Sequence, residues 1–297
     1  MNQRIRKETR YVVVLCFFFV FQFSIAQLTD IARLEYSFIP QSKSEDQYTR
    51  LRALLNYPIE VKNDAYFIIG AEYNRIFLNL EENYPFDTSV LDRIHIIDLN
   101  IGYTFKWNEK WRLGVKFNPR IASTLTKSLS ADDYFLNGGV FLINDRTKDE
   151  SLKRSYRLII GLTYNATVGL PFPLPFVSYY RRINEKWSFN AGIPKSNLKY
   201  TFNKRNNLQA FVGLDGYLAH LQNAVVINGQ NIDHISLSVA IGGFGYEYCF
   251  TKHLVAYMYT GYTLRLNNVL RNKSKDEILK LSDLNTFYLR TGLKFKI

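Results

Sequence analysis

Apolar and polar residues alternate with a period of two along most of the chain after about residue 30. In the last segment, Phe287, Leu289 and Leu293 fall on one face, whereas Arg290 and Lys294 fall on the other. Because successive side chains of a β-strand point to opposite faces, this pattern predicts about fourteen strands, each with one apolar and one polar surface. They are expected near residues 32–41, 48–61, 65–79, 94–107, 111–124, 134–145, 155–168, 172–183, 187–194, 198–203, 207–221, 234–250, 254–267 and 286–297.

The polar faces of these segments carry charges of both signs. Unpaired charges in a dry core cost several kcal/mol each, so a packed sandwich would not tolerate them at this density. We therefore predict an all-β fold, a transmembrane antiparallel up-and-down β-barrel with lipid outside and a hydrated or ion-paired lumen. The residues expected to face the lumen are Arg50, Arg52, Glu72, Asp98, Arg112, Lys116 and Arg120.

The connections between the predicted strands are of two kinds. Short polar turns lie near residues 62–64, 108–110, 184–186, 204–206 and 251–253, and the last four follow aromatic strand ends. Long polar connections span 81–93, 125–133, 222–233 and 268–285. With fourteen strands and both termini in the periplasm, all the short turns fall on the periplasmic side and these long connections fall outside. The long, charged connection 145–153 is the exception, because parity places it in the periplasm.

Two regions are irregular. Pro171, Pro173, Pro175 and Pro194 are hard to place in paired central strands because proline lacks a backbone donor, and inward folding of residues 193–197 would reduce the count to twelve. Around Gly242 and Gly243 the apolar positions change from odd to even numbers, which predicts a β-bulge.

Residues 1–26 form a predicted secretory signal peptide, and a single barrel domain follows over residues 27–297. Basic residues precede an apolar stretch at 11–23, and small residues precede the expected cleavage point. A retained anchor is the alternative, but this stretch is too short for about 30 Å of hydrocarbon. Cys16 lies inside it, which leaves Cys249 alone in the mature chain and excludes an internal disulfide.

Composition and charge agree with a membrane barrel. The chain is 47% hydrophobic and 15% aromatic, yet no later stretch has the roughly 18 uninterrupted apolar residues of a membrane helix. The formal net charge of +12 becomes +9 when the signal peptide takes away four basic residues and one acidic residue. These charges are dispersed, so contact with lipid phosphates or anionic solutes is expected and nucleic-acid binding is not.

The chain resembles the uncharacterised outer-membrane β-barrel proteins of Gram-negative bacteria. The resemblance is carried by residues 24–27, the Asn-Glu-Lys-Trp turns ending at Trp111 and Trp187, the stretch 192–200 and the closing strand. It implies an outer-membrane location and a barrel fold, and it carries over no functional residue. The expected partners are outer-membrane lipids and lipopolysaccharide, the barrel-assembly machinery and a small solute.

Candidate chemistry is sparse. The histidines His95, His220, His234 and His253 lack the spacing of a metal site, and no cofactor is expected. His234 and Ser236 share one face of a strand, with Ser238 beside them, which raises a membrane phospholipase as a minor alternative. Small hydroxyl side chains are also ordinary lining of a lumen, so we predict that the protein is not an enzyme.

The lumen charges give the remaining functional indication. A cationic wall would favour a channel or transporter for small anionic or amphipathic solutes, whereas a paired network would plug the barrel. The alternative is therefore a closed structural or surface-interaction barrel whose outer loops, especially residues 268–285, contact surface components.

Overall fold

The computed structural model describes residues 30–40, 46–62, 64–149, 154–166, 169–227, 229–282 and 285–296. The predicted signal peptide with Cys16, residue 63 of one predicted turn and part of the connection 145–153 lie outside these residues. The account below concerns the unit formed by Asp30–Lys296.

Fourteen antiparallel strands form a closed barrel, as the alternation predicts. They are β1 (Ala32–Pro40), β2 (Gln47–Lys62), β3 (Ala65–Asn79), β4 (Arg93–Lys106), β5 (Arg112–Ser123), β6 (Tyr134–Asp145), β7 (Tyr156–Asn165), β8 (Phe172–Arg182), β9 (Trp187–Ile193), β10 (Lys195–Thr201), β11 (Asn206–Ile227), β12 (Gln230–Cys249), β13 (Leu254–Arg271) and β15 (Phe287–Phe295). The short β14 (Glu277–Lys280) pairs with β13 alone.

Two 3-10 helices, η1 (Thr88–Leu91) and η2 (Ala131–Asp133), lie in connections between strands. Neither they nor any other helix in the described residues is long and apolar enough to cross a lipid bilayer.

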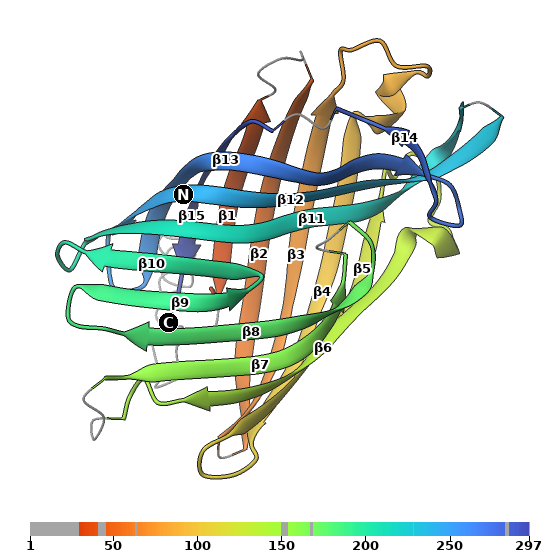
Figure 1. Ribbon diagram of the computed structural model, residues 1–297. Coiled ribbons are helices and arrows are strands. Elements are labelled where there is room, and N and C mark those ends of the chain that lie inside the picture. The colour runs from red at the N-terminus through yellow and green to blue at the C-terminus, as the bar shows by residue number, and fades with distance from the viewer. Residues whose placement is uncertain are drawn as a thin grey trace, which may run out of the picture. The chain divides into compact units, whose positions relative to one another are not determined.

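The barrel closes where the first strand pairs with the last. β1 and β15 are in register from Ala32 opposite Phe295 to Phe38 opposite Leu289, and β15 pairs with β13 on its other side. The strands β7–β13 form a wall that crosses the wall of β1–β6 (Figure 1). The last strand therefore pairs directly with the first, as the predicted up-and-down barrel requires.

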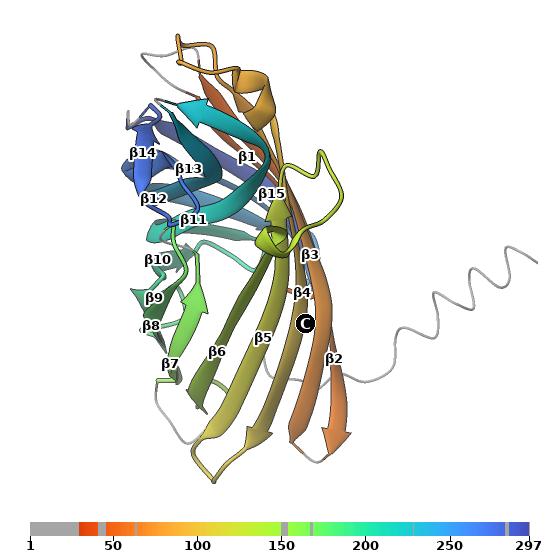
Figure 2. The same ribbon diagram turned by 90° about the vertical axis from the view of Figure 1, so that its right-hand side faces the viewer.

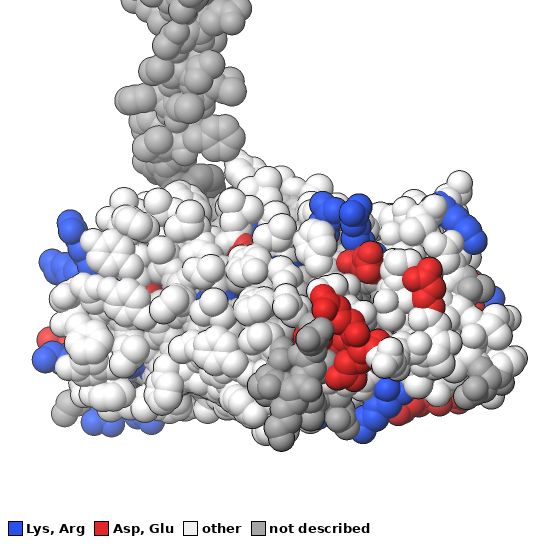
Figure 3. Space-filling view, turned by 90° about the horizontal axis from the view of Figure 1, so that it is seen from above, with Lys and Arg blue, Asp and Glu red and all other residues white. Residues whose placement is uncertain are grey.

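The outer face is apolar on strands all round the barrel. Large side chains such as Leu55, Val115, Leu162, Phe244 and Leu264 are exposed there. Side chains other than Lys, Arg, Asp and Glu cover most of the face seen in Figure 3. Exposed apolar side chains alternating with inward polar ones are what a lipid-facing barrel requires.

Four short turns share one hydrogen-bond pattern. In the β4–β5 turn, the side-chain oxygen of Asn108 accepts from the backbone N–H groups of Lys110 (2.9 Å) and Trp111 (3.0 Å). The same capping role is taken by Asn184, Asn203 and Thr251. Because consecutive strands are antiparallel, these turns lie at one end of the barrel, here called the short-turn end; the opposite end is the loop end.

The proline-rich region keeps the count at fourteen strands, because Pro194 forms the tight turn between β9 and β10 and the chain turns back along β9 there. β9 pairs with β8 only up to Ile193 opposite Val177. Pro173 and Pro175 lie on the part of β8 that β9 does not reach. Proline is tolerated on a strand whose edge has no partner, which explains these two positions.

The loop end holds a dry apolar core. It joins the inner faces of β1–β5 to the facing sides of β11–β13, and includes Ile39, Tyr48, Ile76, Ile94, Ala122, Tyr217, Ile235, Leu237, Val239, Ile241 and Leu270. The expectation of a hydrated or ion-paired lumen therefore does not hold for this end of the barrel.

The β-bulge predicted at Gly242 and Gly243 is wrong. Both glycines pair in unbroken register with β11, and the irregularity lies instead between Ser238 and Val239, which face Asn267 and Arg265 of β13. The apolar face changes because the odd-numbered residues of β12 from Ile235 to Glu247 point inward. At the loop end they meet the dry core, whereas farther along the apolar residues are the even-numbered ones that face outward.

β11 leaves β10 and reaches β5 at the loop end. His220 forms a parallel bridge with Ser123, and the backbone N–H of Thr124 donates to the His220 carbonyl (3.3 Å). β11 and β12 thus extend through most of the predicted connection 222–233. Figure 2 shows the upper part of β11 arching above β6 and β10. At this end the wall therefore passes from β5 directly to β11, without β6–β10.

Candidate functional site

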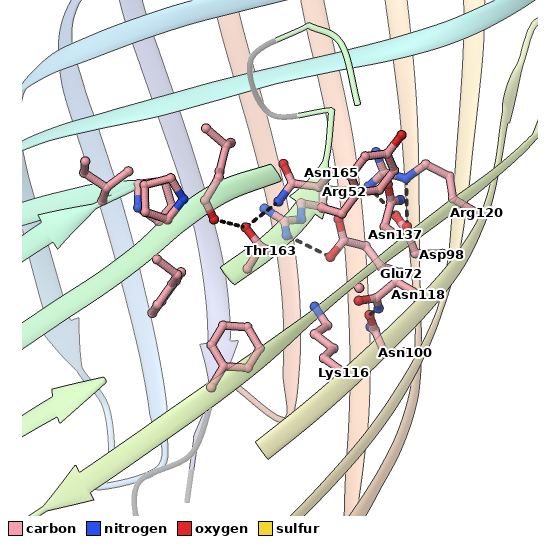
Figure 4. A pocket seen from close by; sticks show the side chains of 18 residues that line it. Arg52, Glu72, Asp98, Asn100, Lys116, Asn118, Arg120, Asn137, Thr163 and Asn165 are labelled. Atoms are coloured by element: carbon pink, nitrogen blue, oxygen red, sulfur yellow. Dashed lines mark hydrogen bonds and ion pairs between the residues drawn. The ribbon is translucent and has the colours of Figure 1, made fainter. Parts of the chain in front are cut away.

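A cavity of about 280 Å³ lies inside the barrel and is here called the lumenal pocket (Figure 4). Its polar wall comes from β2–β6 and carries Arg52, Glu72, Asp98, Asn100, Lys116, Asn118, Arg120 and Asn137. Its apolar wall comes from β6, β8 and the β9–β10 turn and carries Phe141, Leu174, Phe176, Ile193 and Pro194. The pocket is therefore amphipathic.

Two ion pairs neutralise most of the charge on the polar wall. Arg52 donates to Glu72 (2.8 Å) from the neighbouring strand. Arg120 lies directly opposite Asp98 on the neighbouring strand and donates to both of its carboxylate oxygens, at 2.8 and 2.9 Å. The bidentate pair of Arg120 with Asp98 fixes both of its side chains, and the single hydrogen bond of Arg52 holds Glu72 beside it.

Asparagines continue the wall as a hydrogen-bonded row. The amide of Asn118 donates to Asn100, whose amide donates to Asn56 (3.0 Å). Asn137 stands opposite Asn118 on β6 and is only 7% exposed, yet its side-chain Nδ2 has no hydrogen-bond partner in the described part of the chain. A buried amide donor without a partner costs free energy unless a ligand or water satisfies it.

Lys116 is the uncommitted cation of the pocket. It follows the inward face of β5, two residues from Asn118, and no ion pair or hydrogen bond links its ammonium to the other described residues. Figure 4 shows this side chain reaching into the pocket. Three cations and two carboxylates line the cavity, so the lining keeps one positive charge that its own residues do not balance.

Five of the seven predicted lumen residues thus meet in one pocket, and Arg50 and Arg112 do not. Arg50 donates to both oxygens of Asp215 (3.1 and 2.6 Å), which also accepts from Arg290 (2.8 Å). Arg112 lies near the short-turn end, where its guanidinium stands over the Tyr66 ring and donates to the backbone of Asp64.

A second ionic cluster was not predicted from the sequence. Glu247 accepts from Lys199 and Lys294, both at 2.6 Å, and from the hydroxyl of Tyr259 (2.8 Å). The alternation places Lys294 on an inner face, but the carboxylate partner comes from a strand distant in sequence. The ionic lumen expected from the sequence is thus present between the two ends of the barrel.

The arrangement that a phospholipase would need is not formed in the described residues. The Ser236 hydroxyl donates to the Gly169 carbonyl (2.7 Å), and no hydrogen bond joins it to His234. Within those same residues, no group of three or more His, Cys, Asp or Glu side chains could hold a metal ion.

One ionisable cluster ties the connections at the loop end together. Asp133 of η2 accepts from His220 (2.8 Å), from the Gln222 amide (2.8 Å) and from the backbone N–H of Ser130 (2.7 Å). Burial raises the pKa of Asp133, but these hydrogen bonds outweigh it and lower the pKa to about 2. The carboxylate therefore stays ionised and holds β11 beside the β5–β6 connection.

A family defined by sequence matches residues 25–296, and its description is a domain of unknown function, DUF6268. The chain belongs to this family, which confirms the resemblance to uncharacterised barrels. No curated protein matches the chain.

Solved structures of similar architecture are remote. The COG4313 outer membrane channel from Pseudomonas putida F1 is 12% identical, with 94% of this chain and 100% of that chain covered and a TM-score of 0.42. The translocator domain of the autotransporter NalP from Neisseria meningitidis is 10% identical, with 100% and 96% covered and a TM-score of 0.39. The NanC porin is 14% identical, with 90% and 100% covered and a TM-score of 0.38. Likenesses this low carry no argument about function.

Proposed function

We propose that this member of DUF6268 is an outer-membrane channel or transporter for a small anionic or amphipathic solute. The observation that carries the proposal is the pair of uncommitted donors in the lumenal pocket, the Lys116 ammonium and the Asn137 amide. A barrel with a purely structural lumen would gain stability by pairing both groups. Left unpaired beside a cavity, they suit a carboxylate or another anion.

The outer-membrane location rests on three features. The outer face is apolar around the barrel, the short turns gather at one end, and the first residues have the pattern of a cleaved signal peptide. In this orientation the short-turn end faces the periplasm and the loop end faces outward.

A second function, a closed structural or surface-interaction barrel, is favoured by a different observation. The described residues place an apolar core across the loop end, and Arg50 with Asp215 and Arg290 ties opposite walls together. In this alternative the lumenal pocket is a packing defect and the outer loops carry the function.

Reconstitution in lipid vesicles and planar bilayers separates the two. We expect vesicles that contain the protein to take up small organic carboxylates faster than matched amines, with conductance steps that are small because the loop end is closed. Lys116→Glu should reverse the preference for anions, because it converts the uncommitted positive charge into a negative one.

Arg112→Glu is the matched control. Arg112 lies on the same strand, but it does not line the lumenal pocket, so its variant should keep the preference for anions. If neither uptake nor conductance exceeds that of empty vesicles, the closed barrel is the correct function and the transport proposal fails.

A further inference from the structure

Three basic side chains lie together on the outward face of the barrel, where β3 and β4 approach the loop end. They are Arg75 of β3 with Arg93 and His95 of β4, here called the basic patch. Arg75 stands directly opposite His95 in the β3–β4 ladder, and Arg93 stands opposite Phe77. Side chains at opposite and diagonal positions of antiparallel strands are near neighbours, so the three groups share one surface.

The alternation of exposure along both strands places the basic patch on the outside. In β4, Ile94 is fully buried in the dry core, whereas its neighbours Arg93 and His95 are exposed and half-buried. In β3, Ile76 is fully buried in the same core, and Arg75 beside it is half-buried. Because successive side chains of a strand point to opposite faces, the basic patch faces away from the core.

The basic patch begins where the apolar outer surface of β4 ends. The outward apolar side chains of this strand run from Ile97 to Phe105, which is about 27 Å along the strand at about 3.4 Å per residue. With a strand tilt of about 40° this length covers roughly 20 Å of membrane, close to the apolar band of about 25 Å in outer-membrane barrels. The next outward residues, His95 and Arg93, therefore reach the level of the lipid head groups.

The two guanidinium charges of the basic patch are not balanced within the described part of the chain. There, neither Arg75 nor Arg93 has an ion pair, and the buried Nε of Arg75 has no hydrogen-bond partner. The exposed Asp92 precedes Arg93 in the sequence but forms no ion pair with it. Like charges on neighbouring strands repel each other, so an anion from outside the chain would stabilise the patch.

Aromatic side chains hold two of the three groups against the wall. The Arg75 guanidinium lies over the Phe77 ring, 4.6 Å from its centroid. The Tyr73 hydroxyl forms a hydrogen bond with Nδ1 of His95 (2.8 Å), and the two rings stack with centroids 6.0 Å apart. These contacts use Nδ1 and the ring faces, so the N–H groups of Arg75 and Nε2 of His95 remain available to an acceptor in the membrane.

We propose that the basic patch binds a phosphate group of a glycolipid in the outer leaflet. Arg75 and Arg93 would donate to its phosphate oxygens, because guanidinium groups match the geometry of phosphate and cations at the head-group level attract anionic lipids. The acyl chains would lie along the apolar surface beside Ile97 and beside Leu51 of β2, which stands opposite Arg75. This inference rests on the proposed function for the membrane location and for the outward direction of the loop end.

The charge of the basic patch favours a phosphate monoester over the diester of a phospholipid. A monoester carries about −1.5 to −2 charges at neutral pH, whereas a diester carries a single negative charge. Two adjacent guanidinium groups therefore match a phosphorylated sugar, such as that of lipid A, better than a phospholipid head group.

Native mass spectrometry of the purified protein in detergent would test the site, because each bound lipid adds a resolved mass. Lipid A with its phosphates should bind at least about tenfold more tightly than lipid A without them. Arg75→Gln combined with Arg93→Gln should weaken binding of the phosphorylated form about thirtyfold and leave the dephosphorylated form unchanged. Arg93→Gln alone, at an exposed position, should weaken it about fivefold.

Lys110→Gln combined with Lys186→Gln is the matched control, because it removes two exposed cations at the short-turn end. A loss in this control as large as in the double arginine variant would overturn the site. Phosphatidylglycerol that binds as tightly as lipid A would overturn the assignment to a glycolipid, and displacement of lipid A by low concentrations of inorganic phosphate would overturn a lipid ligand. Solute uptake plays no part in this measurement, so the lipid site and the proposed function can fail separately.

Discussion

At the scale of single residues, the inner surface holds two kinds of charged group. Most are neutralised by partners on other strands, as Arg120 is by Asp98, whereas Lys116 is left uncommitted. Paired charges inside a protein contribute little net stability, because desolvation offsets their attraction. Breaking such a pair is costly, however, since it leaves one charge without compensation. The pairs therefore fix the shape of the lumen, and the uncommitted group is available for a ligand.

Asp215→Asn should destabilise the barrel by about 3 kcal/mol, because the buried guanidinium of Arg50 loses its carboxylate and the half-buried Arg290 keeps, of the described carboxylates, only Glu35 (3.5 Å). Urea unfolding monitored by tryptophan fluorescence would measure the loss. Asp132→Asn removes an exposed ion pair with Lys273 and should cost no more than about 1 kcal/mol. Equal losses in the two variants would contradict this account of Asp215.

At the scale of elements, the short turns and the short strands have different local causes. The turns form because an asparagine or threonine oxygen caps two backbone N–H groups, and this requirement is visible in the sequence. The shortness of β9 and β10 depends on Pro194, which forms their turn, and on the prolines of β8. The sequence therefore predicted these irregularities but not the course of β11, which leaves β10 and reaches β5 at the loop end.

Asn108→Ala should cost about 1 kcal/mol of unfolding free energy, because the N–H groups of Lys110 and Trp111 lose their shared acceptor. Asn108→Asp keeps an oxygen at that position and should retain most of the stability. The same urea titration measures both variants. A loss in the aspartate variant as large as in the alanine variant would show that capping is not the cause.

The tie between η2 and β11 should depend on pH only in acid. The pKa of Asp133 is lowered to about 2 in the folded protein, whereas it is about 3.9 in an unfolded chain. Its contribution is therefore fully present above about pH 4 and is lost as the pH falls toward 2. Hydrogen exchange of the Thr124 amide, which bonds the His220 carbonyl, would report this loss, corrected for intrinsic exchange rates.

Asp133→Asn is the control for that measurement. It should remove the acid-dependent step while leaving the remaining pH profile unchanged. Protection of the Thr124 amide that falls between pH 7 and pH 5 in the native chain would contradict the assignment to Asp133.

At the scale of the whole molecule, apolar side chains fill the loop end of the barrel, and charged and polar side chains line its middle. The strand count and closure could be predicted because each strand separates lipid from a polar interior. The dry end could not, because Ile235, Leu237 and Val239 show the same period of two whether they face lipid or a core. The contact between Ser123 and His220 has no local signature, as these residues are far apart in the chain.

Ile235→Ala should destabilise the barrel by about 2–5 kcal/mol, because it opens a cavity in a fully buried part of the dry core. Leu264→Ala removes a similar side chain from the outward face, where lipid can fill the space, and should cost less. The two variants would be compared by the temperature at which each one changes from the gel mobility of the folded barrel to that of the unfolded chain. A smaller loss for Ile235→Ala than for Leu264→Ala would exclude a tightly packed loop end.

The direct passage of the wall from β5 to β11 has a consequence for the order of assembly. The first five strands can pair as consecutive hairpins, but their apolar inner surfaces at the loop end gain a partner only when β11 and β12 arrive. Contacts between segments so distant in the chain form slowly. We therefore expect the backbone amides of the loop end to be the last to become protected from hydrogen exchange. A chain truncated after β10 should expose its apolar inner surface, which would favour aggregation or binding by a chaperone.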